Sequence, residues 1–148
     1  MNPTKIISKL PYSKPFLFVD ELLHVDENGA KGRYTFQKDL DFYRGHFTDR
    51  PVTPGVILTE CCAQIGLVCL GIYLGDKTTE NNLQIAFSSS EMEFLLPVYP
   101  DEMVTVVSEK VYYRFQKLKC KVKMFNEKEK LVCRGTLSGM LKSTTDDE

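Results

Sequence analysis

The sequence predicts an α+β fold in which a curved antiparallel sheet wraps round one long buried helix. The first observation is that residues 56–74 are apolar on every side when they are laid out as a helix. The second is that two strand-like stretches precede this run and about five follow it. A helix that is apolar all round needs cover on all sides. A curved sheet provides most of that cover, and a second copy of the chain provides the rest.

Length and composition fit a single domain over residues 1–148. The chain is 43% hydrophobic and 26% charged, which suits a substantial core and argues against disorder. Its formal net charge of -1 points neither to nucleic acid nor to an anionic membrane as a partner. The five cysteines form no Cys-x-x-Cys pair and suit a reduced core, and the first residues lack a signal-peptide pattern. We therefore expect a cytoplasmic protein.

The first two strands are predicted at residues 16–26 and 30–38, joined by a hairpin. Asn28 and Gly29 lie between them, and both residue types tolerate positive φ, as a tight hairpin turn requires. His24, near the end of the first strand, has no acid, serine or cysteine at a motif spacing. A structural role for His24 is the favoured interpretation.

A loop then leads into the central helix, for which Thr53 is the predicted N-cap, Pro54 the first helical residue and Gly75 the stop signal. The run approaches the ~20 residues that cross a bilayer. However, basic residues flank neither end, and the strands elsewhere need a core element. Three polar residues also interrupt the run: Thr59, Glu60 and Gln64. We therefore expect a buried helix and no membrane span.

Strand-like segments follow the helix at residues 83–87, 91–96, 103–113, 115–125 and 131–141. Residues 88–90 are interpreted as a turn or a strand interruption, and residues 142–148 as a frayed acidic tail. Between Lys117 and Met124, apolar residues alternate with four lysines, so one face of this strand packs against the core and the other faces solvent. The lysine face is either a docking surface for an acidic carrier protein or a solubilising surface, and the second interpretation is favoured.

Glu60 is the single charged residue of the apolar helix. An ionised carboxylate costs several kcal/mol to desolvate, so Glu60 either faces a polar cavity or is held partly protonated, and both suit a general acid. Gln64 lies one turn later on the same face and can hold the carboxyl group. Alternatively, Glu60 reaches solvent near the helix start, where the dipole favours an acid.

His46 and Gly55 complete a possible catalytic set. His46 lies in the loop and titrates near neutrality, which makes it a candidate base or a loop histidine bonded to backbone. Amides at the helix start can polarise a carbonyl oxygen, and Gly55 lets a ligand approach the backbone. A base, an acid and an oxyanion donor suit proton abstraction beside a carbonyl followed by loss of a β-hydroxyl. With no metal-ligand, phosphate-loop or nucleophile motif, neither a metal nor a cofactor is expected.

Three segments carry a family resemblance. They read Leu-Pro-Tyr-Ser-Lys-Pro-Phe-Leu-Phe-Val-Asp at residues 10–20, Gly-His-Phe-Thr-Asp-Arg-Pro-Val-Thr-Pro-Gly-Val at 45–56 and Glu-Cys-Cys-Ala-Gln at 60–64. They resemble the (3R)-hydroxyacyl-[acyl carrier protein] dehydratases of bacterial fatty acid synthesis. The resemblance implies the hot-dog fold, a long helix in a curved antiparallel sheet, with the chains paired as homodimers and often assembled into trimers of dimers.

The resemblance also implies a role for each site residue. His46 would take the proton from C2 of the acyl thioester, and Glu60 of the partner subunit would protonate the leaving C3 hydroxyl. The amide of Gly55 would bind the thioester carbonyl, and Gln64 would position Glu60. A glutamate at this position is similar to the dehydratase branch that lacks isomerase activity.

The resemblance therefore implies a dehydratase that forms trans-2-enoyl thioesters on an acyl carrier protein. Tyr12, Thr48 and Thr53 depart from the residues usual in that family, which leaves room for a specialised pathway such as polyene or secondary lipid synthesis. Two other functions stay open. One is a hot-dog thioesterase in which Glu60 activates water, and the other is a non-catalytic subunit that binds acyl thioesters.

Overall fold

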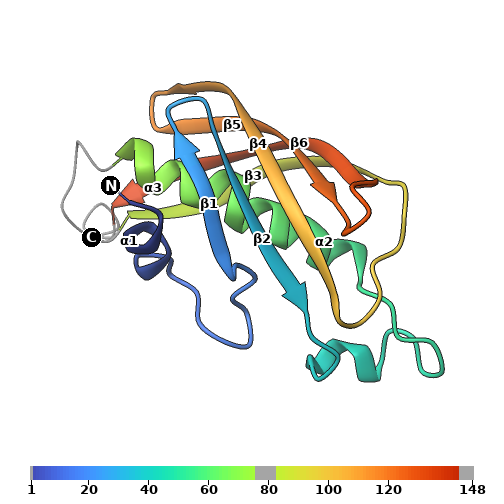
Figure 1. Cartoon of the computed structure of the whole chain (residues 1–148). Helices are drawn as coiled ribbons and strands as arrows, with labels where there is room; N and C mark the ends of the chain where they lie inside the picture. The colour runs from blue at the N-terminus through green and yellow to red at the C-terminus, as the bar shows by residue number, and fades with distance from the viewer. Residues whose placement is uncertain (1, 76–82, 144–148) are drawn as a thin grey trace.

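A computed structural model describes residues 2–75 and 83–143 and has the expected α+β architecture (Figure 1). Six strands form one antiparallel sheet in the order β1-β2-β4-β5-β6-β3, so β1 and β3 lie at its edges. The strands are β1 (Glu21–Asp26), β2 (Gly29–Phe36), β3 (Leu83–Phe94), β4 (Glu102–Arg114), β5 (Lys117–Phe125) and β6 (Leu131–Ser143). The predicted curved antiparallel sheet is confirmed.

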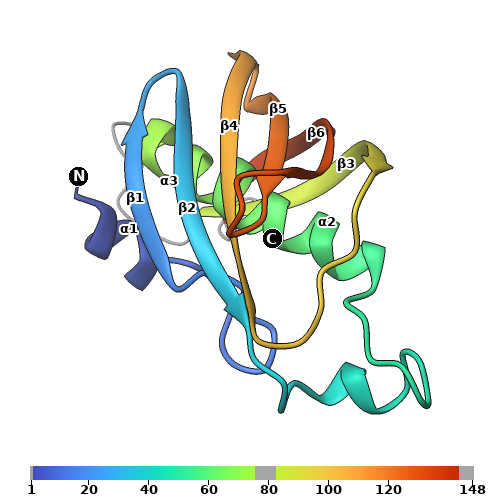
Figure 2. The same ribbon diagram turned by 45° about the vertical axis from the view of Figure 1, so that its right-hand side comes forward.

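The predicted central helix is also confirmed, and it runs without a break from Gly55 to Gly75. It consists of α2 (Gly55–Ala63), the π-helical segment η2 (Gln64–Val68) and α3 (Cys69–Gly75). In Figure 2 the strands curve round this helix. By length and composition it could cross a membrane, but 72% of its most apolar stretch is buried inside the fold. It is the core helix of the sheet that surrounds it.

Alternation along β5 places its apolar side chains against the helix. Leu118, Cys120, Val122 and Met124 are all buried. The helix approaches β4 and β5 closely at Gly66, where a Cβ atom would lie 2.9 Å from Cβ of Ser108 and 3.0 Å from Cγ1 of Val122. A larger residue at this position would push the helix away from β4 and β5, because interiors are closely packed.

Three parts of the chain differ from the predicted elements. The first strand begins only at Glu21, and two short helices that were not predicted, α1 (Pro3–Ser8) and η1 (Asp41–Arg44), lie outside the sheet. The two segments predicted at 83–87 and 91–96 form one strand, β3, with a register shift between Phe87 and Ser89. Ser143 ends β6, and the rest of the predicted tail lies outside the described residues.

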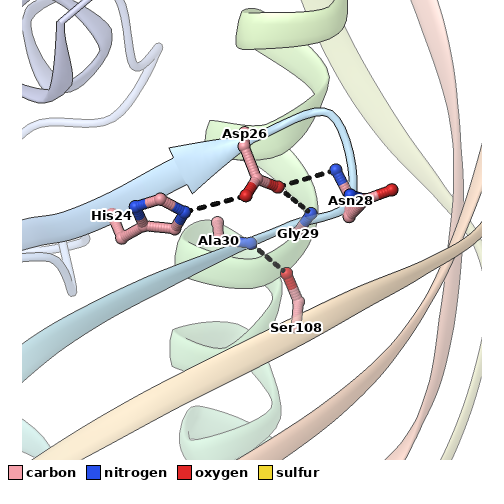
Figure 3. A network of polar contacts seen from close by, with 6 residues as sticks. All are labelled: His24, Asp26, Asn28, Gly29, Ala30 and Ser108. Carbon is pink, nitrogen blue, oxygen red and sulfur yellow. Dashed lines mark hydrogen bonds and ion pairs between the residues drawn. The ribbon is translucent and has the colours of Figure 1, made fainter.

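The β1–β2 hairpin is confirmed, but the predicted reason for its turn is wrong. Neither Asn28 nor Gly29 has a positive φ. Instead, the carboxylate of Asp26 closes the turn by accepting hydrogen bonds from the amides of Asn28 (2.8 Å) and Gly29 (3.1 Å), as Figure 3 shows. Glycine is required at position 29 because a Cβ atom would lie 2.0 Å from the carbonyl oxygen of Ser108 on β4.

His24 belongs to the same turn network (Figure 3). Its Nε2 lies 2.9 Å from Oδ2 of Asp26, and its side chain is 64% exposed. The hydrogen bond from His24, followed by that from the amide of Asn28, lowers the pKa of Asp26. These contacts agree with a structural role for His24.

Candidate active site

Gln64 holds Glu60 in place and ties it to the N-terminal segment. Its Nε2 donates a hydrogen bond to Oε2 of Glu60 at 3.0 Å, as the spacing of the two residues on one helix face predicts. The same Nε2 donates to the carbonyl of Phe16 at 2.9 Å, and Oε1 accepts from the amide of Phe18 at 2.8 Å. Gln64 is fully buried, so all its partners are fixed by the fold.

Glu60 itself is half-buried. Burial raises its pKa, and the hydrogen bond from Gln64 opposes this increase only in part. A carboxyl group that keeps its proton to higher pH is better suited to act as a general acid. Tyr12 lies close enough to be affected, because burial and then the negative charge of Glu60 raise the pKa of Tyr12 to about 12. Tyr12 therefore carries no charge at neutral pH.

The raised pKa of Glu60 makes folding stability depend on pH. A carboxyl group whose pKa is higher in the folded chain favours folding below its unfolded pKa, and this contribution is lost as the pH rises through the folded pKa. Glu60→Gln removes the titration. We therefore expect the variant to unfold at a higher urea concentration than the wild type at about pH 7, with little difference at about pH 4. A lower urea midpoint for the variant at neutral pH would contradict this.

Gln64→Leu should destabilise the fold. It leaves the buried amide of Phe18 without an acceptor, which costs about 1–3 kcal/mol in the free energy of unfolding. Denaturant unfolding measures the loss. Gln37→Leu, at an exposed position, is the matched control and should change stability by no more than about 0.5 kcal/mol. Equal stability of the two variants would show that the Gln64 contacts contribute nothing.

The loop between η1 and α2 orients His46. Its Nδ1 lies 2.9 Å from the carbonyl oxygen of Val52, and the amide of Val52 donates back to the carbonyl of His46 at 2.9 Å. A carbonyl only accepts hydrogen bonds, so the neutral ring carries its proton on Nδ1 and leaves the lone pair of Nε2 free. The bond to backbone that one interpretation of His46 expected is present, and it leaves the histidine in a tautomer that can act as a base.

The central helix begins at Gly55 without a side-chain cap. The prediction that Thr53 is the N-cap is wrong, because the N-cap is Pro54. The Thr53 hydroxyl instead makes a hydrogen bond with the hydroxyl of Tyr43, and its amide donates to the carbonyl of Val98 at 2.9 Å. Within the described part of the chain, the backbone amides of Gly55 and Val56 donate no hydrogen bond. Such amides are suited to bind a carbonyl oxygen or an oxyanion.

An open depression of about 290 Å³ lies beside these amides. Side chains from the helix start and from the segment after β3 line it: Thr53, Gly55, Leu58, Phe94, Leu95, Leu96 and Pro97. Its apolar lining and the free amide of Gly55 suit the carbonyl end of an acyl chain.

The predicted base and the predicted acid have different hydrogen-bond partners within one chain. In the described residues, His46 and Glu60 share no hydrogen bond or ion pair. Glu60 follows Gly55 by five positions, which places the two residues about 140° apart round the helix. The sheet wrapped round one helix that carries these groups defines the class of the chain: it is a hot-dog-fold protein.

The chain belongs to the family of FabA-like domains, whose family model matches residues 10–136. Among its relatives is the 3-hydroxyacyl-[acyl-carrier-protein] dehydratase FabZ of Wolbachia sp. subsp. Drosophila simulans (strain wRi). It is 31% identical over 147 residues, which cover 96% of this chain and 97% of the relative. The dehydratase FabZ of Caldicellulosiruptor saccharolyticus is 30% identical over 135 residues and covers 90% of this chain and 94% of its own length.

Solved structures share the fold at low sequence identity. The dehydratase heterocomplex ApeI:P from Xenorhabdus doucetiae matches with a TM-score of 0.80 and 12% identity, over 98% of this chain and 94% of that chain. A hypothetical thioesterase from Streptococcus pneumoniae, solved with coenzyme A, matches with a TM-score of 0.64 and 17% identity, over 83% of this chain and 85% of that chain.

Proposed function

We propose that the chain is a 3-hydroxyacyl-[acyl carrier protein] dehydratase, which converts (3R)-hydroxyacyl thioesters into trans-2-enoyl thioesters in fatty acid synthesis. The observation that carries this proposal is the presence of a base and an acid among the candidate residues. The bond from Nδ1 of His46 to the carbonyl of Val52 leaves Nε2 able to accept a proton, and burial raises the pKa of Glu60. Dehydration needs both a base and an acid. The dehydratase relatives support the same reaction.

In the proposed reaction, Nε2 of His46 takes a proton from C2 of the substrate. The amide of Gly55 donates to the thioester carbonyl and stabilises the negative charge that develops on its oxygen. The C2–C3 double bond forms as the C3–O bond breaks. Glu60 of the partner subunit gives its proton to the departing hydroxyl, which leaves as water. The proton on His46 then returns to the carboxylate through solvent, which restores both groups.

The proposed site requires two chains. Within the described residues of one chain His46 bonds to Val52 and Glu60 to Gln64, with no polar contact between the two. The edge strand β3 offers a long strand to which a second copy can pair. The apolar side chains beside its end, Phe94, Leu95 and Leu96, are 37–48% exposed and suit a subunit interface. We therefore propose a homodimer, with a trimer of dimers as a further assembly.

Acyl carrier protein is the proposed macromolecular partner, because it carries the acyl substrate, and neither nucleic acid nor a membrane is part of the proposal. The proposed location is cytoplasmic. All five cysteines are buried free thiols, which suits a reducing compartment.

Product analysis tests the proposed function. The purified protein is incubated with (3R)-3-hydroxybutyryl-acyl carrier protein, and the products are measured by mass spectrometry. Loss of one water with the thioester intact supports the dehydratase. Release of the free acid would instead show a thioesterase, as the coenzyme A-bound structural neighbour suggests. Tight binding of substrate without turnover would show a non-catalytic subunit.

A further inference from the structure

The side of Gly55 that lacks a side chain is already occupied. A Cβ atom at this position would lie 3.2, 3.3 and 3.4 Å from Cζ, Cε1 and Cε2 of Phe94. A glycine at this position was expected to make room for a ligand, but the space holds the ring of Phe94. Phe94 ends β3, where it is paired with Cys133 of β6, so the strand fixes the direction of the ring.

The ring of Phe94 and the free amide of Gly55 border the same depression. If the carbonyl oxygen of a thioester accepts a hydrogen bond from this amide, the carbonyl carbon and the neighbouring C2 lie close to the start of the helix. Non-bonded carbon atoms pack at about 3.5–4.0 Å. Because Phe94 and Gly55 line the same depression, the ring forms one wall of the space that C2 of a substrate bound to the Gly55 amide would enter, and it leaves little room for a carbon branch there.

We propose that Phe94 is a specificity-determining residue that admits substrates with two hydrogens on C2 and rejects those with a methyl branch at C2. The inference rests on the proposed dehydratase function and adds a restriction on its substrates. A 2-methyl-3-hydroxyacyl thioester keeps one hydrogen on C2, so it can still lose water chemically. Its rejection is a matter of space, and a hydrophobic wall discriminates one methyl group by roughly 10–200-fold.

The test compares 3-hydroxybutyryl and 2-methyl-3-hydroxybutyryl thioesters on acyl carrier protein, with both C2 epimers of the branched substrate. We expect the wild type to prefer the unbranched substrate by at least about tenfold in kcat/KM. Phe94→Ala should reduce this preference by about tenfold, whatever its effect on the unbranched substrate. Phe87→Ala is the matched control, since Phe87 lies on the same strand with 46% exposure against 48% for Phe94. It should leave the preference unchanged.

A second pair of variants tests the contact itself. Gly55→Ala should lower kcat/KM for the unbranched substrate because the new methyl group displaces the ring of Phe94. The double variant Gly55→Ala with Phe94→Ala should recover activity, because the space is then free. If the methyl group at position 55 instead blocks the substrate directly, removal of the ring restores nothing.

The outcomes separate the inference from the function on which it rests. A wild type that dehydrates neither substrate overturns the proposed function. A wild type that dehydrates the unbranched substrate but shows no preference against the branch overturns the role of Phe94 alone. An unchanged preference in Phe94→Ala, with the oligomeric state intact by light scattering, overturns it as well.

Discussion

His46→Ala should lower the rate of dehydration by about 10²–10⁴-fold, because it removes the group that takes the C2 proton. The bond from Nδ1 of His46 to the carbonyl of Val52 leaves Nε2 as the basic atom, and alanine offers no replacement. Single-turnover kinetics with (3R)-3-hydroxybutyryl-acyl carrier protein measure the chemical step directly. Substrate binding should change much less than the rate.

The second histidine of the chain provides the matched control. His24 lies in the turn network of the β1–β2 hairpin, with its side chain 64% exposed. His24→Ala removes the same kind of side chain and should leave the dehydration rate within about twofold, as surface substitutions usually do. If His46→Ala retains full activity, or if both variants lose activity equally, His46 is not the base.

Mixed dimers should recover activity from two inactive variants. In the proposed site, His46 of one chain acts with Glu60 of the partner subunit. A dimer that pairs a His46→Ala chain with a Glu60→Gln chain then has one doubly altered site and one intact site. Random pairing makes half of the dimers mixed, so co-expression should restore about a quarter of wild-type activity. This is a large effect against a background close to zero.

Two differently tagged chains make this experiment decisive. Tandem purification isolates the mixed dimer, which should have about half of wild-type activity per dimer because one of its two sites is intact. Each variant expressed alone is the control and should show almost none. If His46 and Glu60 acted within one chain, every chain in the mixture would carry a defect, and neither preparation would recover activity.

Local patterns in the sequence predict most of the fold. The alternation of Leu118, Cys120, Val122 and Met124 with lysines places one face of β5 in the core, as the structure has it. The continuous apolar run predicts the buried helix. In both cases the signal repeats with the period of the element itself, so neighbouring residues suffice to predict it.

Contacts between distant residues account for two of the errors. The strand predicted from residue 16 starts at Glu21, because the amide of Phe18 bonds to the side chain of Gln64 instead of joining the sheet. Threonine is a residue type that often caps helices, but the hydroxyl of Thr53 forms a hydrogen bond with the hydroxyl of Tyr43. In each case a polar group could form a hydrogen bond with a local or with a distant partner, and in the folded chain it bonds to the distant one.

Residue types and short spacings were enough to predict the sheet and the helix, the candidate residues His46, Gly55, Glu60 and Gln64, and the kind of chemistry that they suit. The tertiary structure added the nitrogen of His46 that stays available as a base, the tether from Gln64 to the N-terminal segment and the ring of Phe94 against Gly55. Each depends on groups that lie apart in the chain and are brought together by packing, which no local pattern encodes.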